Sequence, residues 1–194
     1  MNRFREAAAR WMERRYGVKL DPATEVVSLI GSKEGIAHLP LALINPGDVA
    51  FVTSPGYPPS VNGVLFAGGV VHPLPLTREN HFLPDLKSIP KPVLSKAKIL
   101  YVNYPNNPTA AVAPRAFYEE AIAFAKKNEI VIVSDAAYAE LYEGQGQRPL
   151  SLLEIPGGRD VGIEFHSLSK TFNMTGWRIG WACGNAEAVA ALGK

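Results

Sequence analysis

Residues 114–135 read PRAFYEEAIAFAKKNEIVIVSD, and this stretch decides the fold class. Its first part, Pro114–Asn128, has the pattern of an amphipathic helix with proline at an early helical position. The apolar residues on one face of this helix are Phe117, Ala121, Phe124 and Ala125. The second part, Ile130–Asp135, is a short and almost wholly apolar run, typical of a strand buried on both faces. A helix followed at once by such a strand indicates one step of an alternating α/β fold.

The same alternation extends over the rest of the chain. Six further strands are predicted at Glu25–Ile30, Asp48–Ser54, Val70–Leu76, Ile99–Asn103, Gly162–Leu168 and Ile179–Gly184. Further helices are predicted at Ser32–Ile44, at Pro58–Ala67 and near the N-terminus, where the apolar stripe is Phe4, Ala7, Ala8, Trp11 and Met12. The sequence therefore predicts an α/β fold with a mostly parallel seven-stranded sheet and helices on both faces.

Composition excludes several classes of protein. With 47% hydrophobic and 20% charged residues and no apolar run near the roughly 20 residues of a membrane helix, the chain reads as globular rather than membrane-spanning or disordered. The 20 Lys and Arg are scattered among 18 Asp and Glu, so nucleic-acid binding is not expected. The single Cys183 leaves neither an internal disulfide nor a cysteine-rich metal site. Without a signal-peptide pattern, a cytoplasmic location is expected.

Loops at the carboxyl ends of strands are where chemistry gathers in such a sheet. The first of these loops, Gly31-Ser32-Lys33-Glu34-Gly35, opens a helix whose free N–H groups suit a phosphate. A helix N-cap by Ser32 is the favoured interpretation of the loop taken alone. The motifs G-x-x-x-x-G-K-[ST], G-x-G-x-x-G and G-x-S-x-G are absent, which removes the usual ATPase, dinucleotide and serine-hydrolase interpretations.

Two further loops combine proline with a side chain able to contact a ligand. Pro55–Pro59 holds Tyr57 on a stiff turn, where the ring either stacks on a flat ligand or covers the core. Tyr104–Thr109 holds Asn106 and Asn107 between two prolines. Turn chemistry alone explains Asn and Pro there, but not so much stiffness in one loop.

The last two loops carry opposite charges. Asp135 ends a buried strand, so it needs a cation or several donors, unless it serves only as a helix N-cap. Lys170 follows another apolar strand between Leu168 and Phe172, which favours partial desolvation and a nucleophilic amine. Arg178 comes eight residues later. For His166, packing or hydrogen bonding is favoured over a role as a base.

A single ligand could contact the side chains of all these loops. It offers a flat ring to Tyr57, a cationic ring nitrogen to Asp135 and an aldehyde to Lys170. A phenolate-like oxygen would suit Asn107 and Tyr138, and a phosphate would suit Ser32, Ser167, Ser169 and Arg178. Pyridoxal 5′-phosphate has all of these groups.

Three motifs carry a resemblance to a known family. The segments N-N-P-T (Asn106–Thr109), D-x-x-Y (Asp135–Tyr138) and S-L-S-K-T-F-N-M-T-G-W-R-I-G (Ser167–Gly180) resemble those of the fold-type I, class I/II aminotransferases. More narrowly, G-S-K-E-G-I-A-H-L-P-L-A, N-P-G-D-V and G-I-E-F-H-S-L-S-K-T-F are similar to the bacterial LL-diaminopimelate aminotransferases. The resemblance covers essentially the whole chain. It departs at Ala110, where many relatives have Gly, and little consequence is expected.

The resemblance implies a role for each site residue. Lys170 would form the Schiff base with pyridoxal phosphate and move the substrate proton, and Asp135 would pair with the ring nitrogen. The residues around the ring would be Tyr57, Asn107 and Tyr138, those around the phosphate Ser32, Ser167, Ser169 and Arg178, and those near substrate Lys33, Tyr57 and Asn107, with Lys33 also near the phosphate.

The resemblance also implies an activity and a domain organisation. The expected reaction is transamination between an amino acid and 2-oxoglutarate, with LL-2,6-diaminopimelate as the donor. The alternatives are another aminotransferase of the class, acting on alanine, aspartate or aromatic amino acids, and a non-catalytic cofactor-binding module, which the intact Lys170 disfavours. Residues 1–194 would form most of a large cofactor-binding domain, without an N-terminal segment and a C-terminal small domain. The full-length protein would be a homodimer, and these 194 residues alone are expected to be inactive.

Overall fold

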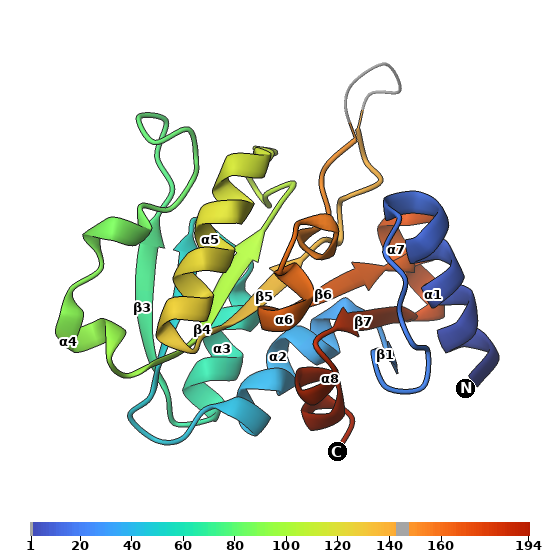
Figure 1. Ribbon diagram of the computed structural model, residues 1–194, viewed down its shortest axis with the longest axis horizontal. Helices are drawn as coiled ribbons and strands as arrows, with labels where there is room; N and C mark the ends of the chain where they lie inside the picture. The colour runs from blue at the N-terminus through green and yellow to red at the C-terminus, as the bar shows by residue number, and fades with distance from the viewer. Residues whose placement is uncertain (1, 143–147) are drawn as a thin grey trace.

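A seven-stranded sheet forms the centre of the computed structural model, which describes residues 2–142 and 148–194 (Figure 1). Its strands are β1 (Val26–Leu29), β2 (Val49–Ser54), β3 (Val70–Pro75), β4 (Ala97–Asn103), β5 (Val131–Asp135), β6 (Gly162–Ser167) and β7 (Gly180–Gly184), in the order β1-β7-β6-β5-β4-β2-β3. All pairs from β3 to β6 are parallel. Only β7 runs the other way, antiparallel to both β6 and β1. The predicted mostly parallel sheet of seven strands is therefore confirmed.

The helices match the prediction at the longer elements and extend it at the short ones. They are α1 (Asn2–Tyr16), α2 (Ser32–Leu43), α3 (Pro58–Phe66), α4 (Lys91–Leu94), α5 (Arg115–Asn128), α6 (Gly158–Val161), α7 (Leu168–Thr171) and α8 (Ala186–Leu192). Three 3₁₀ turns are η1 (Leu86–Ser88), η2 (Leu152–Glu154) and η3 (Thr175–Trp177). Leu168, predicted to end a strand, instead begins α7, and its N–H bonds to the carbonyl of Ile179. No described helix is long and apolar enough to cross a membrane.

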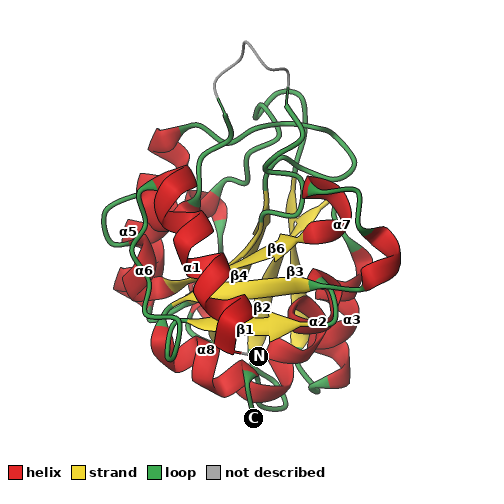
Figure 2. Cartoon of the chain, turned by 90° about the vertical axis from the view of Figure 1, so that its right-hand side faces the viewer, coloured by secondary structure: helices red, strands yellow, loops and turns green. Residues whose placement is uncertain are grey.

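Side-chain alternation along the strands divides the core between the two faces of the sheet. On β2, Phe51 packs toward α5, whereas Ala50 and Val52 pack toward α2 and α3. Helix α8 joins α2 and α3 on that second face. The strands accordingly form a central layer between helices (Figure 2). Helices on both faces were predicted, and this is confirmed.

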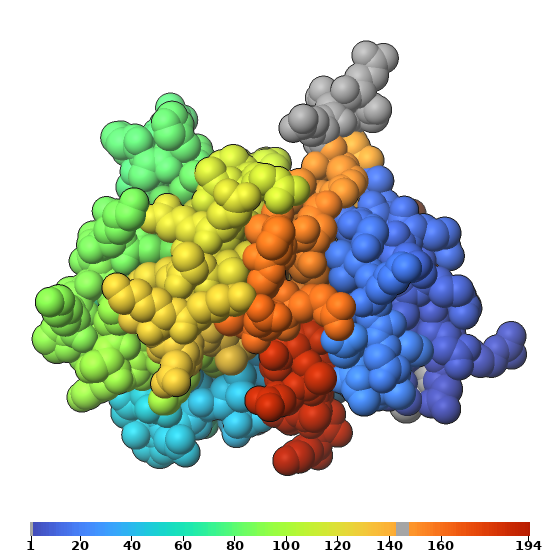
Figure 3. All heavy atoms as spheres, viewed as in Figure 1, coloured from blue at the N-terminus to red at the C-terminus, as the bar shows by residue number. Residues whose placement is uncertain are grey.

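Helix α1 covers the β7 and β1 end of the sheet. Its buried residues are Ala8, Ala9, Met12 and Tyr16. The predicted stripe was wrong at Ala7, which is exposed, because the buried face is rotated toward Ala9 and Tyr16. In the space-filling view the residues that follow α1 lie against the segment around residue 160, where Arg159 bonds to the carbonyl of Lys19 and pairs with Glu25 (Figure 3).

Edge strand β3 tolerates two prolines for a simple reason. Pro73 and Pro75 pair with Val52 and Ser54 of β2, and they lie two residues apart. Both positions that lack an N–H group can therefore face away from β2, where no strand needs a donor. Proline at this edge also blocks further strand addition.

Ala110 carries more strain than the sequence led us to expect. Its φ of 60° lies in the left-handed region, and its N–H bonds to the carbonyl of Asn106 at 2.8 Å. A non-glycine residue in this conformation costs about 1–2 kcal/mol. Part of this cost is offset because the unfolded chain has less conformational entropy with alanine than with glycine.

We expect Ala110→Gly to raise the free energy of unfolding by about 0.5–1 kcal/mol in urea titrations. Ala123→Gly, in the exposed middle of α5, is the control and should lower it by a similar amount. A loss of stability in Ala110→Gly would contradict the strain.

Candidate functional site

One cavity of about 200 Å³ collects every site residue predicted from the sequence. Its lining consists of Ser32, Lys33, Tyr57, Asn107, Asp135, Tyr138, Ser167, Ser169, Lys170 and Arg178, together with Ala137. The fold explains why these residues lie together. Strands β1, β2, β4, β5 and β6 run in one direction, so their carboxyl ends share one edge of the sheet. Arg178 joins them from the amino end of antiparallel β7.

The α2 end of the cavity is built to hold an anion. Helix α2 starts at Ser32, and its N-cap is Gly31, which has no side chain to bond the first N–H groups. The favoured interpretation of Ser32 as an N-cap was therefore wrong. The guanidinium of Arg178 lies beside these groups, and its Nη1 donates to the Ser169 hydroxyl at 3.4 Å. Unpaired N–H groups, hydroxyls and a guanidinium together favour a phosphate.

Two glycines allow this close packing. Gly31 has φ +84°, and a Cβ built on it would come 2.7 Å from Nη2 of Arg178. A Cβ on Gly180 would come 2.9 Å from the backbone nitrogen of Ser32. Larger residues at either position would push the guanidinium or the start of α2 away from the anion site.

Asp135 lines the same cavity from the end of β5. It is 6% exposed, and its Oδ1 accepts one hydrogen bond from the Ala137 N–H at 3.2 Å. Burial raises the pKa of this carboxyl to about 6, although that N–H and the positive charges of His166 and Lys170 oppose the rise. Residues 137–140 form turns rather than a helix, so Asp135 caps no helix there, and its bond to the Ala137 N–H is a turn contact. A buried carboxylate with one donor favours a cationic ligand.

An amine and two aromatic rings also line the cavity. Lys170 is half-buried on α7, and its Nζ lies 5.9 Å from the centre of the Tyr138 ring. Burial, followed by the negative charge of Asp135 and by Tyr57, raises the pKa of Tyr138, so its phenol stays protonated and able to donate. Tyr57 lines the cavity instead of joining the core, and Nζ of Lys33 lies 5.9 Å from its ring centre. The core-covering interpretation of Tyr57 is therefore wrong.

The two amides of the N-N-P-T motif separate in the structure. Asn106 is buried, and its Oδ1 accepts from both the N–H and the hydroxyl of Thr109, which closes the turn. Asn107 lines the cavity, and its N–H donates to Oδ1 of Asn103 at 2.7 Å. Asn103, the last residue of β4, was missed from the sequence. The sequence feature that could have identified Asn103 is the one that identified Asp135, a polar residue at the end of an apolar strand.

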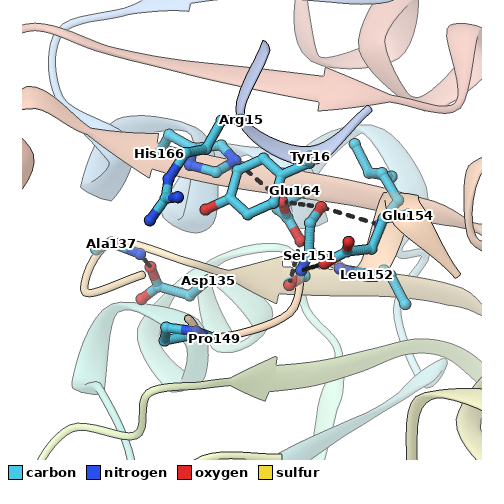
Figure 4. A network of polar contacts seen from close by, with 12 residues as sticks. Arg15, Tyr16, Asp135, Ala137, Pro149, Ser151, Leu152, Glu154, Glu164 and His166 are labelled. Atoms are coloured by element: carbon cyan, nitrogen blue, oxygen red, sulfur yellow. Dashed lines mark hydrogen bonds and ion pairs between the residues drawn. The ribbon is translucent and has the colours of Figure 1, made fainter. Parts of the chain in front are cut away.

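A buried charge network beneath the cavity was also missed (Figure 4). Glu164 is fully buried, and it receives four hydrogen bonds, from His166 at 3.0 Å, Ser134 at 3.1 Å, Ser151 at 2.7 Å and the Leu152 N–H at 2.8 Å. Burial works to raise the pKa of Glu164, but these bonds and the His166 charge outweigh it and hold the pKa below its ordinary value. His166 also stacks on Trp181 with ring centres 4.8 Å apart. The favoured packing and hydrogen-bonding role of His166 is confirmed.

Helix α1 supports the segment that carries Tyr138. Nε of Arg15 lies 3.0 Å from both carboxylate oxygens of Glu140, and its Nη2 donates to the Tyr142 hydroxyl at 2.5 Å. The Tyr16 hydroxyl also donates to Glu140. Helix α1 therefore holds the turn after β5 through Glu140, which lies two residues beyond Tyr138.

Comparison with known proteins agrees with this geometry. The chain is 57% identical over all 194 residues to the LL-diaminopimelate aminotransferase of Syntrophobacter fumaroxidans, covering 50% of that protein. It is 58% identical over 191 residues, 98% of the chain, to the LL-diaminopimelate aminotransferase of Aquifex aeolicus, covering 49% of it. The chain thus spans about half the length of these curated relatives.

Solved structures give the same picture. The substrate-bound structure of BacF from Bacillus subtilis superposes with a TM-score of 0.95 at 45% identity, over 99% of this chain and 48% of that one. The profile of the family described as aminotransferase class I and II matches residues 1–194. Members of this family use pyridoxal phosphate to exchange amino groups between amino acids and oxo acids. From the match over the whole chain, we conclude that the chain belongs to the class I and II aminotransferases.

Proposed function

We propose that this chain forms the large cofactor-binding domain of an enzyme that transfers an amino group from LL-2,6-diaminopimelate to 2-oxoglutarate. One observation supports the cofactor part of this proposal. A single cavity is lined by a guanidinium at its anion end, an amine and a buried carboxylate, which belong to Arg178, Lys170 and Asp135. Identity near 57% to enzymes named LL-diaminopimelate aminotransferase supports the choice of donor.

The chemistry of the lining fits pyridoxal 5′-phosphate. Its phosphate would lie at the start of α2 among Ser32, Ser167, Ser169 and Arg178. Its ring nitrogen would meet Asp135, whose raised pKa reflects a carboxylate that needs a positive partner. The fit of Gly31 and Gly180 against Arg178 and α2 leaves the anion end open for the phosphate.

Each residue then has a chemical task. When bound, the cofactor supplies an aldehyde that captures amino groups and a ring that takes up the electrons released at the substrate α-carbon. Nζ of Lys170 would hold the cofactor and, when free, would accept the proton from the substrate α-carbon. The Asp135 carboxylate keeps a proton on the ring nitrogen.

The remaining lining residues position the ring and the substrate. Tyr138 and the side chain of Asn107, which line the cavity, would donate hydrogen bonds to the phenolic oxygen, and Tyr57 would stack on the ring face. Lys33, exposed at the rim, reaches toward the substrate, as do Tyr57 and Asn107. These contacts hold the substrate α-carbon in line with Lys170.

The proposal extends to the complete protein. In this proposal the complete protein acts as a cytoplasmic homodimer. The parts of it outside these 194 residues grip the substrate α-carboxylate and close the site. The 194 residues alone bind the cofactor without turning over substrate.

An amino-donor screen on the complete protein tests the proposal. With 2-oxoglutarate as acceptor, we expect kcat/KM for LL-diaminopimelate to exceed that for alanine, aspartate and tyrosine by about 100-fold or more, because a site that pairs polar groups with the distal end rejects donors lacking it. The meso isomer of diaminopimelate is the matched control, since it differs from the LL isomer only in the configuration of one α-carbon. Preference for alanine, aspartate or an aromatic donor would assign another aminotransferase activity, and no turnover with any donor would indicate a binding module.

A further inference from the structure

One buried amide joins two of the loops that line the cavity. Nδ2 of Asn103 donates to the backbone carbonyl of Asp135 at 2.8 Å. Oδ1 of the same amide accepts the N–H of Asn107 at 2.7 Å. Asn103 is 6% exposed, so water does not compete for these bonds.

The place of Asn103 in the sheet makes this link stiff. It is the last residue of β4, and its Cα pairs with that of Asp135 at the end of β5. Both ends of the amide are used, so its orientation is fixed. The side chains of Asp135 and Asn107 both line the cavity, and the amide therefore connects the backbones of two residues that face the same space.

We propose that Asn103 is a positioning residue that sets the separation between the Asp135 carboxylate and the Asn107 side chain to match one ligand ring. This inference rests on the proposed function, in which Asp135 meets the ring nitrogen and Asn107 the phenolic oxygen of that ring. These two atoms are a fixed distance apart in a rigid aromatic ligand. A protein link of fixed length between their partners lets both contacts form at once, which raises affinity without a new contact to the ligand.

The chain offers a matched control for a merely structural amide. Asn185 also uses both ends of its amide, because Nδ2 donates to the Asp160 carbonyl at 2.9 Å and Oδ1 accepts the N–H groups of Glu187 at 3.1 Å and Ala188 at 3.0 Å. It follows β7, which ends at the opposite edge of the sheet from the cavity. Loss of either amide leaves backbone groups unpaired and lowers stability.

The experiment compares Asn103→Ala with Asn185→Ala in the 194-residue chain. Three quantities are measured: the free energy of unfolding in urea, the dissociation constant of pyridoxal phosphate, and the pH midpoint of the absorbance change of the bound cofactor. We expect both variants to lose stability. Only Asn103→Ala should weaken cofactor binding, by about 10-fold, which is equivalent to about 1.4 kcal/mol. Only this variant should shift the pH midpoint.

A double-mutant cycle separates positioning from general loosening. If Asn103 acts through Asn107, Asn103→Ala should weaken cofactor binding much less when Asn107 is already alanine. Should Asn103→Ala fail to fold, Asn103→Asp takes its place, since it keeps the volume and the oxygen that accepts from Asn107. Equal cofactor affinity and pH midpoints in the Asn103 and Asn185 variants would overturn the inference alone. Failure of the unaltered chain to bind pyridoxal phosphate would overturn the proposed function and the inference with it.

Discussion

Replacement of Lys170 by alanine is expected to abolish covalent capture of pyridoxal phosphate and to slow transamination by the complete protein at least about 10²–10⁴-fold, the usual contribution of a positioned proton-transfer group. The amine of Lys170, on α7, lines the same cavity as Arg178 and Tyr138. The measurement is reduction with borohydride in the presence of cofactor, followed by mass spectrometry of the labelled peptide.

Lys33 provides the control, because it is the second amine that lines the same cavity. Lys33→Ala should keep the label on Lys170 and retain the proton-transfer step while binding substrate less well. A label found on Lys33 in the unaltered chain, with Lys170 free, would refute the assignment of Lys170.

The second large effect concerns Asp135, where function and stability are expected to oppose one another. In the folded chain without cofactor, burial raises the pKa of Asp135 from 3.8 to about 6. The unfolded chain therefore loses this proton first as the pH rises, and ionisation favours unfolding between about pH 4 and pH 6. Asp135→Asn removes this penalty, so without cofactor it should be more stable at pH 7.5 by about 1–3 kcal/mol.

The same substitution should impair the reaction severely. Asparagine cannot hold a proton on the ring nitrogen by charge, so removal of the α-carbon proton in the complete protein should slow by orders of magnitude while cofactor still binds. Urea titrations at pH 4 and pH 7.5 and single-turnover kinetics measure the two effects. Unchanged stability at pH 7.5 together with near-normal turnover would show that Asp135 serves only the turn to Ala137.

Much of this architecture could be predicted because apolar runs and helical periodicity directly reflect burial. The apolar run Ile130–Ser134 predicted a buried strand, and Asp135 at its end pointed to the site. The four-residue helices α4 and α6 were missed, since such a short segment carries no periodicity. Their ends depend on neighbouring packing more than on their own residues.

The missed polar residues have a different explanation. Glu164 stands between apolar residues of β6, where a single carboxylate reads as a solvent-facing position, yet four donors from three segments surround it. Gly31 replaced Ser32 as the cap because the loop needs a positive φ and room for Arg178. Apart from His166, the partners that decide both cases are separated in the sequence, as Ser134 is from Glu164 and Arg178 from Gly31, so a local pattern does not predict them.

The reversed direction of β7 has a consequence for how the site comes together during folding. Residues 168–179 leave β6 and return on its neighbour β7, with Ser167 paired to Gly180 and the Leu168 N–H bonded to Ile179. Lys170 and Arg178 therefore meet across a short loop, whose closure costs little entropy. Asp135 and Asn107 join them only after parallel crossovers with far larger sequence separation, which form slowly. The amine and the guanidinium would thus be assembled as a local hairpin, ready before the strands that hold the ring are in place.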